Sequence, residues 1–223
     1  MKTLLIGLLL LGFTGVATAE SRAKLDSRIE KLSKKLELMQ QKPEKRIPAE
    51  HLRKAKGIVL LDRTKAGFLF AYQGGAGVAM VKDKSGQWGP AAFVEANEAS
   101  LGFQIGGQQS FIVILLMTTN ATQTLTEANI EFGGEARGTA GNTSAGVEEK
   151  VASSEAQMLV YSDRKGLFGG AAIKGGAIAP DEEANLAYYG EFLTMRDILF
   201  DRKVKATETA RNLARNIKAY AEE

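Results

Sequence analysis

The hydrophobic pattern begins with one short apolar run. Residues 4–16 are mostly apolar, Met1 and Lys2 come before them, and Ala17-Thr18-Ala19 comes after them. A basic start, a short apolar stretch and a small-x-small tripeptide are the three parts of a secretory signal peptide. We therefore expect cleavage between Ala19 and Glu20, with an uncleaved membrane anchor as the alternative. The mature chain would then be exported, and periplasmic or secreted in a bacterium.

Residues 20–46 carry apolar side chains at the spacing of an α-helix. The positions on one helical face, separated by 4, 3, 4 and 3 residues, are Leu25, Ile29, Leu32, Leu36 and Met39. Basic residues repeat this spacing one position earlier, about 100° around the helix: Lys24, Arg28, Lys31 and Lys35. Pro43 ends the pattern, and the segment has a net charge of +4. We expect a basic amphipathic helix.

Three uses are open to this helix. It could pack its apolar face on the rest of the protein, since most helix stability comes from such packing. It could instead lie on an anionic lipid surface. It could also pair with a second helix in a homodimer, because its spacing is heptad-like. One apolar face cannot insert into lipid and pack on the protein at the same time.

The middle of the chain predicts strands joined by turns. Short apolar runs alternate with turn sequences such as Asp83-Lys-Ser-Gly86. The longest apolar run, Phe111–Met117, has the length of a strand and is too short to span a bilayer. Short helices are expected at residues 48–56 and 119–129, the second capped by Thr119 or Asn120. Together these patterns predict an α+β fold with a mainly antiparallel sheet.

Glycine pairs recur within the predicted strands. All 21 glycines that follow the expected cleavage site lie between Gly57 and Gly190, and they include Gly74-Gly75, Gly106-Gly107 and Gly175-Gly176. Paired glycines in strands permit bulges, sharp bends and close approach of a second backbone. We therefore expect a curved, glycine-rich sheet or a partial barrel. A ligand pressed against the bare backbone is the alternative.

Residues 191–223 return to a helical pattern without glycine. Their apolar side chains form two groups: Phe192, Met195, Ile198 and Leu199, then Leu213, Ile217 and Tyr220. Basic residues line the polar surface: Arg196, Arg202, Lys203, Lys205, Arg211, Arg215 and Lys218. We expect N- and C-terminal helices to flank the sheet, with a helix in 201–223 that packs on the domain or extends it. Its cations are expected to be solvated.

Composition excludes several kinds of chemistry. The absence of cysteine excludes disulfides, thiolate metal sites and cysteine-linked lipid anchors. The single histidine, His51, lacks the partners of a catalytic site and is expected to be exposed or to cap a helix. The acidic residues Asp181–Glu183 lack the alternation of a calcium loop. Phosphate-binding and hydrolase motifs are absent, and a net charge of +3 is too small to indicate nucleic-acid binding. We predict no enzyme activity, metal or cofactor.

Short motifs follow one another in order through residues 47–200. They are Ile47-Pro48, Ala55-Lys-Gly-Ile58, Gly74-Gly-Ala-Gly-Val78, Gly86-Gln-Trp-Gly-Pro90, Ser100-Leu-Gly-Phe-Gln-Ile-Gly106, Tyr161-Ser162, Gly166-Leu-Phe-Gly169, Gly175-Gly176 and Asn185-Leu-Ala-Tyr-Tyr-Gly190. In this order they resemble the SYLF lipid-binding domain of bacterial exported proteins and of eukaryotic membrane and actin-patch adaptors. One departure is the polar stretch 139–144, which stands where many members have a Gly-Pro step. We therefore expect four divisions: a signal peptide at 1–19, a basic amphipathic helix at 20–46, a SYLF-like domain at 47–200 and a C-terminal helix at 201–223.

The resemblance implies recognition of anionic phospholipid or phosphoinositide-like headgroups, through a basic amphipathic N-terminal helix in eukaryotic members. On this chain the lipid-binding residues would be Lys24, Arg28, Lys31, Lys35, Leu25, Ile29, Leu32 and Leu36. We therefore predict a non-enzymatic lipid-binding protein of the bacterial envelope, without the actin and adaptor roles of eukaryotic members. An envelope structural or assembly factor, acting through protein contacts of the helix, is the alternative. A carrier that encloses an acyl chain in the curved sheet is a third possibility.

Overall fold

The computed structural model describes residues 21–66, 71–100, 108–127, 130–132, 157–163, 166–168 and 176–223. An eight-stranded sheet forms its centre, with the strands β1 (Gly57–Ala66), β2 (Ala71–Val81), β3 (Ala92–Ser100), β4 (Gln108–Leu116), β5 (Ile130–Phe132), β6 (Met158–Ser162), β7 (Gly166–Phe168) and β8 (Gly176–Pro180). Their order is β5-β8-β3-β2-β1-β4-β6-β7. Every described pairing is antiparallel, which confirms the predicted α+β class.

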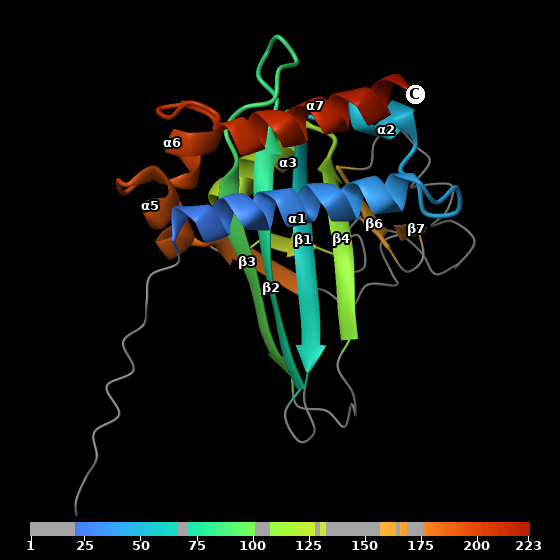
Figure 1. Ribbon diagram of the computed structural model, residues 1–223, viewed down its shortest axis with the longest axis horizontal. Helices are drawn as coiled ribbons and strands as arrows, with labels where there is room; N and C mark the ends of the chain where they lie inside the picture. The colour runs from blue at the N-terminus through green and yellow to red at the C-terminus, as the bar shows by residue number, and fades with distance from the viewer. Residues whose placement is uncertain are drawn as a thin grey trace, which may run out of the picture.

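The sheet is curled and open. In Figure 1, β8 and β5 run across the view behind the nearly vertical β1–β4, so the sheet turns sharply at this edge. Within the described strands, the two end strands β5 and β7 are not paired with each other. The curvature expected from the glycines is therefore present, while a closed barrel is not.

Helices cover both faces of the sheet. They are α1 (Arg22–Gln40), α2 (Ala49–Lys54), α3 (Thr119–Gln123), the 3-10 helix η1 (Thr124–Thr126), α5 (Glu182–Tyr189), α6 (Met195–Leu199) and α7 (Glu208–Glu222). Buried residues of α1, α2, α5 and α7 share one core with the first face, and those of α3, η1 and α6 share another core with the second. In Figure 1, α1 and α7 lie side by side across the near face of β1–β4.

The alternation of side chains along each strand supplies both cores. Successive strand residues point to opposite faces. On β1, Ile58 and Leu60 therefore join the core under α1, while Val59 and Leu61 join the core under α6. Both faces are covered, so the strand reads as an unbroken apolar run instead of an apolar-polar alternation.

The glycines of β2 allow close packing against β1. A Cβ added to Gly77 would lie 2.3 Å from the backbone oxygen of Leu60, and one added to Gly75 would lie 2.8 Å from that of Asp62. The bare backbone of β2 thus faces a neighbouring strand, which favours the architectural use of these glycines over a ligand contact. The similar pair Gly106-Gly107 lies outside the described residues.

The apolar face of α1 packs directly on the sheet. Its five predicted face residues are at most 2% exposed: Leu25, Ile29, Leu32, Leu36 and Met39. The expected helix over residues 20–46 is therefore present as Arg22–Gln40, and its heptad-like stripe contacts the protein's own core. Of the three uses considered for this helix, the structure shows the packing of its apolar face on the rest of the protein.

A cluster of hydroxyl groups joins α1 to α5 and to the start of α7. The carboxylate of Asp26 on α1 accepts hydrogen bonds from the Tyr188 hydroxyl at 2.6 Å and the Thr209 hydroxyl at 2.5 Å. Tyr188 also lies 2.7 Å from the hydroxyl of Thr207, which caps the start of α7. Burial is the main cause that raises the pKa of Tyr188 above its usual value. The cluster fixes α1, α5 and α7 relative to one another.

Two residues of the motif Asn185–Gly190 have structural roles. The side chain of Asn185 on α5 accepts from the Phe93 amide at 2.8 Å and donates to the Phe93 carbonyl at 3.1 Å, so it pairs the backbone of β3 just beyond the residues that pair with β8. Gly190 ends α5 with a φ of 77°, a left-handed conformation that glycine adopts without steric cost. The motif Asn185–Gly190 therefore joins α5 to the sheet and ends that helix.

The C-terminal flank divides between the two faces of the sheet. Ile198 and Leu199 of α6 lie in the second core, whereas Leu213 and Ile217 of α7 lie in the first. Phe192 was expected to join the first apolar group of this flank but is 68% exposed, because it lies in the connection before α6. The short helix at 119–129 is capped by Thr118 rather than by Thr119 or Asn120. No described helix has the length and apolar character needed to cross a membrane.

Replacing Gly77 with alanine should destabilise the fold, because the added methyl group would collide with rigid backbone of β1. We expect Gly77→Ala to lower the free energy of unfolding by about 2–3 kcal/mol in chemical denaturation. Gly86→Ala is the control: Gly86 has a φ of 83° and no atom within 4 Å of the added Cβ, so the cost should be about 1 kcal/mol. Equal costs for the two variants would contradict the close-packing account.

Candidate functional site

The predicted basic stripe of α1 is largely paired with carboxylates of the protein. Arg28 forms an ion pair with Asp181 at 2.9 Å and lies over the ring of Phe93. Lys31 and Lys35 both contact the carboxylate of Asp62 on β1, at 2.9 and 2.7 Å. The structure therefore brings three of the four predicted cations onto internal partners.

Asp62 is the acceptor that holds the middle of the stripe. Its burial alone would raise its pKa, but the hydrogen bonds and charges of Lys35 and Lys31 more than offset this, so the pKa lies below its usual value. The side chain of Lys35 is 26% exposed and that of Lys31 is 66% exposed. Asp62 thus pairs with Lys31 and Lys35, two cations that the sequence pattern alone predicts to be available to lipid.

The remaining predicted residues lie in two different environments. Lys24 is exposed, and its side chain forms no ion pair with another described residue. The four apolar residues predicted to contact lipid, Leu25, Ile29, Leu32 and Leu36, are instead in the core. Of the two competing uses expected for this stripe, this conformation has the packing on the sheet, and a contact of these residues with lipid stays a prediction.

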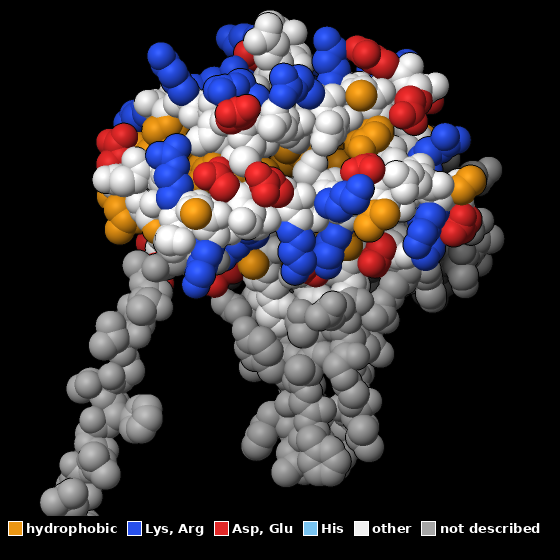
Figure 2. Space-filling model, viewed as in Figure 1, with side chains coloured by type: hydrophobic (Ala, Val, Ile, Leu, Met, Phe, Trp, Pro, Cys, Tyr) orange, Lys and Arg blue, Asp and Glu red, His pale blue; other side chains and the backbone are white. Residues whose placement is uncertain are grey.

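A second row of cations lies on α7. We call Arg211, Arg215 and Lys218 the α7 ridge; all three are exposed. Arg211 donates to the carbonyl of Ala206 at 2.5 Å, and Arg215 donates to the side chain of Asn212. Lys218 lies 3.8 Å from Glu222, and both of these side chains are more than 60% exposed. Figure 2 shows Lys and Arg side chains gathered along the top of the molecule, where α7 runs in Figure 1.

The end of α7 adjoins a basic corner at α2. The guanidinium of Arg53 donates to the carbonyl of Ala221 at 3.1 and 3.2 Å, which joins α2 to the last turn of α7. Lys82 donates to the carbonyls of Leu52 and Arg53 and lies 4.7 Å from the ring of Trp88. Burial, followed by the charge of Lys56, lowers the pKa of Lys82.

His51 has a structural position in this corner. It is partly buried, and its Nδ1 contacts the hydroxyl of Tyr161 on β6. Burial is the largest cause that lowers the pKa of His51, and it also raises the pKa of Tyr161. The expectation of an exposed or helix-capping histidine is therefore wrong, because α2 packs this ring on the sheet.

Charge is separated between two segments of the sequence, 22–56 and 200–223, and the rest of the chain. Residues 22–56, which include α1 and α2, contain 12 basic and 5 acidic side chains; residues 200–223, which include α7, contain six and four. Since the whole chain has a net charge of +3, these two segments carry +9 and the remainder carries −6. The net positive charge of the protein is therefore concentrated in the two segments that contain α1, α2 and α7.

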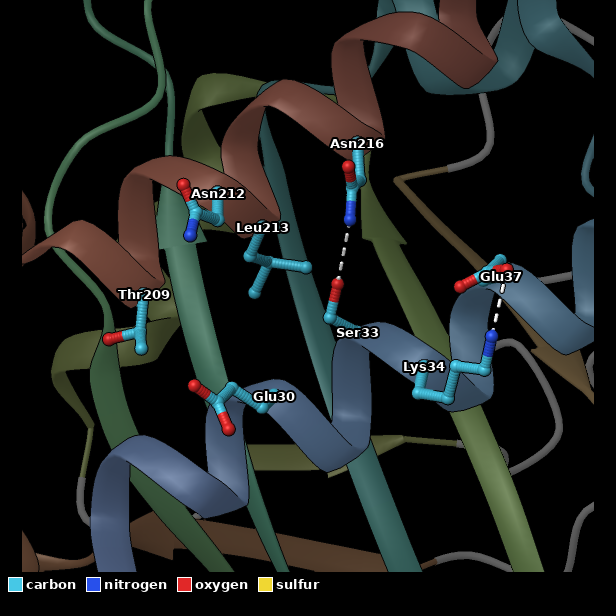
Figure 3. Close-up of a pocket in the computed structure, with 8 residues that line it drawn as sticks. All are labelled: Glu30, Ser33, Lys34, Glu37, Thr209, Asn212, Leu213 and Asn216. Atoms are coloured by element: carbon cyan, nitrogen blue, oxygen red, sulfur yellow. Dashed lines mark hydrogen bonds and ion pairs between the residues drawn. The ribbon is translucent and has the colours of Figure 1, made fainter. Parts of the chain in front are cut away.

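A shallow groove of about 230 Å³ separates α1 from α7. Figure 3 shows Glu30, Ser33, Lys34 and Glu37 on α1 facing Thr209, Asn212 and Asn216 on α7, with Leu213 between the helices. Asn216 bridges the groove by donating to the Ser33 hydroxyl at 3.0 Å.

Within the part of the chain that the structure describes, no three acidic or histidine side chains are grouped to hold a metal. Asp181 instead caps α5 and pairs with Arg28.

Removal of the Asp62 carboxylate should loosen α1 in a pH-dependent way. A carboxylate whose pKa is lowered by folding stabilises the folded state above its unfolded pKa, near 3.8, and loses this effect as pH falls through the folded pKa. We expect Asp62→Asn to lower the free energy of unfolding by about 1 kcal/mol at pH 7, and by less below pH 4. Denaturation at pH 7 and pH 3 measures both values. Asp201→Asn, an exposed position, is the control; a deficit that stays constant between the two pH values would contradict the pairing account.

Comparisons with known proteins agree on one family. The family model described as "Ysc84: Las17-binding protein actin regulator" matches residues 97–220. "LAS seventeen-binding protein 3" of Saccharomyces cerevisiae is 33% identical over 160 residues, which cover 70% of this chain and 35% of the yeast protein. "Protein YSC84" of the same yeast is 32% identical over 179 residues, 78% of this chain and 38% of that protein. The human "SH3 domain-containing YSC84-like protein 1" is 32% identical over 160 residues, 71% of this chain and 47% of the human protein.

The similarity covers most of this chain but less than half of each of these relatives. No solved structure matches. The family match extends from the end of β3 into α7 and thus includes strands β4 to β8, Asn185 and the α7 ridge. Because it spans more than half of the sequence, the chain belongs to the Ysc84 family, in agreement with the resemblance of its motifs to SYLF domains.

Proposed function

We propose that the protein is a non-enzymatic module of the bacterial envelope that binds anionic phospholipid or phosphoinositide-like headgroups at a membrane face. The observation that carries this proposal is the +9 charge of residues 22–56 and 200–223, set against −6 in the rest of the chain. Each basic residue close to an anionic leaflet contributes about 1 kcal/mol, and salt screens this attraction. The charge separation supports adsorption through the segments that contain α1, α2 and α7.

Adsorption fits the structure better than insertion of α1. Each fully buried Leu or Ile contributes about 1.5–3 kcal/mol, so the four buried residues of the stripe contribute about 6–12 kcal/mol to docking. This is comparable to the whole stability of a typical domain, about 5–15 kcal/mol. The folded protein would therefore keep α1 on the sheet and meet the membrane with its cations.

The alternative is an envelope structural or assembly factor that acts through protein contacts. The relatives named "SH3 domain-containing" and "LAS seventeen-binding" are more than twice as long as the matched region. For this chain, dimerisation through the α1 stripe requires the helix to leave the sheet, because Leu25, Ile29 and Leu32 are fully buried. The packing of α1 therefore favours the lipid proposal over this alternative.

Vesicle flotation tests the proposal with residues 20–223, which include every element that the structure describes. We expect the protein to float with vesicles of phosphatidylcholine and phosphatidylglycerol at 50 mM salt, and to be released at about 500 mM because the Debye length shortens. Vesicles of phosphatidylcholine alone are the control. Failure to float with anionic vesicles at low salt would falsify the proposal, and a lipid-independent dimer in light scattering would then support the alternative.

Export to the envelope is a separate part of the proposal. Residues 1–19 have the three parts of a signal peptide, so the full chain expressed in a Gram-negative host should be found in the periplasmic fraction. Intact-mass measurement should give the mass of residues 20–223. Recovery of the uncleaved chain from the cytoplasm would contradict export, without affecting the lipid proposal.

A further inference from the structure

We infer that the α7 ridge, rather than the basic stripe of α1, is the surface that lies on the anionic membrane. This inference rests on the proposed function and assigns its contact surface. It concerns Arg211, Arg215 and Lys218, which were expected only to be solvated.

The first argument is the difference in pairing between the two rows of cations. Lys31 and Lys35 on α1 share the carboxylate of Asp62, and their transfer to lipid phosphates would leave that half-buried carboxylate without compensation. On α7, neither Arg211 nor Arg215 forms an ion pair with a carboxylate of the described residues. The exposed contact of Lys218 with Glu222 at 3.8 Å contributes little. The α7 cations can therefore contact phosphate without breaking a buried ion pair.

The second argument is the geometry of α7. Its buried residues, Ala210, Leu213, Ile217 and Ala221, fix one side of the helix against the core. Positions 211, 215 and 218 follow the i, i+4, i+7 spacing of one helical face, so the three cations lie in a row over about 10 Å. Figure 2 shows cations exposed along this edge of the molecule. A row of cations held by a docked helix suits a flat anionic surface and requires no unfolding.

The third argument is the surroundings of the ridge. The contact of Arg53 with the Ala221 carbonyl places α2 against the end of α7, with the exposed Lys54 and Lys56 close by in sequence. Acidic residues lie at the ends of the helix, at Glu208 and at Glu222 and Glu223. The exposed large hydrophobic side chains of the described residues, Leu38, Leu186 and Phe192, are all on other segments. The ridge should thus adsorb through charge, without inserting apolar side chains.

Two variants with equal losses of charge separate the two surfaces. The ridge variant carries Arg211→Gln, Arg215→Gln and Lys218→Gln; the stripe variant carries Lys24→Gln, Lys31→Gln and Lys35→Gln. In flotation with phosphatidylcholine–phosphatidylglycerol vesicles, we expect the ridge variant to bind about 10- to 100-fold more weakly than the wild type. The stripe variant should bind within about threefold of the wild type. Circular dichroism confirms that each variant is folded.

The absence of native cysteine allows a direct measurement of proximity. Ala219→Cys on α7 and Ser27→Cys on α1, both at exposed positions, are labelled separately with a fluorophore. Vesicles that carry nitroxide-labelled headgroups should quench the dye at position 219 strongly and the dye at position 27 weakly.

Each outcome decides between the proposals. If the wild type does not bind, the proposed function fails. If the wild type binds but the stripe variant loses as much affinity as the ridge variant, or more, the assignment to α7 is overturned and lipid binding stands. Stronger quenching at position 27 than at position 219, or unchanged binding of the ridge variant, also overturns it.

Discussion

The burial of α1 against the sheet is the interaction on which the rest of the structure depends. Leu25, Ile29, Leu32, Leu36 and Met39 fill the space over β1 and its neighbours, and α7 then packs beside them. Once this face is covered, the apolar stripe of α1 is not available to lipid or to a second helix, although Leu38 on the same helix stays exposed. The polar sides of α1 and α7 become the outer surface of the protein, so its interactions are decided by which of their charges have internal partners.

The internal partners come from distant parts of the chain. Asp62 follows its partner Lys35 by 27 residues, and Asp181 follows its partner Arg28 by 153. Both carboxylates meet the cations of α1 because the sheet and α5 lie beneath that helix. The cations of α7 are exposed, and these two acids pair with cations of α1 instead. Two helices with similar basic rows therefore differ in how much of their charge is available to a ligand.

The local elements could be predicted from the sequence, but the assignment of the charges could not. The 4-3-4-3 spacing correctly predicts α1, and the apolar runs correctly predict an antiparallel sheet, because both patterns depend on side-chain periodicity alone. Arg211, Arg215 and Lys218 show the same helical spacing as the stripe of α1, so a signal for them existed. The sequence does not reveal that Asp62 faces Lys31 and Lys35, since that contact depends on the sheet register. The exposure of Phe192 and the burial of His51 likewise depend on tertiary packing.

The hydroxyl cluster has a consequence for how the chain reaches its native state. Asp26 and Thr209 are 183 residues apart in sequence, and Ser33 and Asn216 are separated by the same distance. Contacts of such long range form late and slow folding, because a long loop must close before they add stability. The first face therefore cannot be completed until α7 has been synthesised and has met α1.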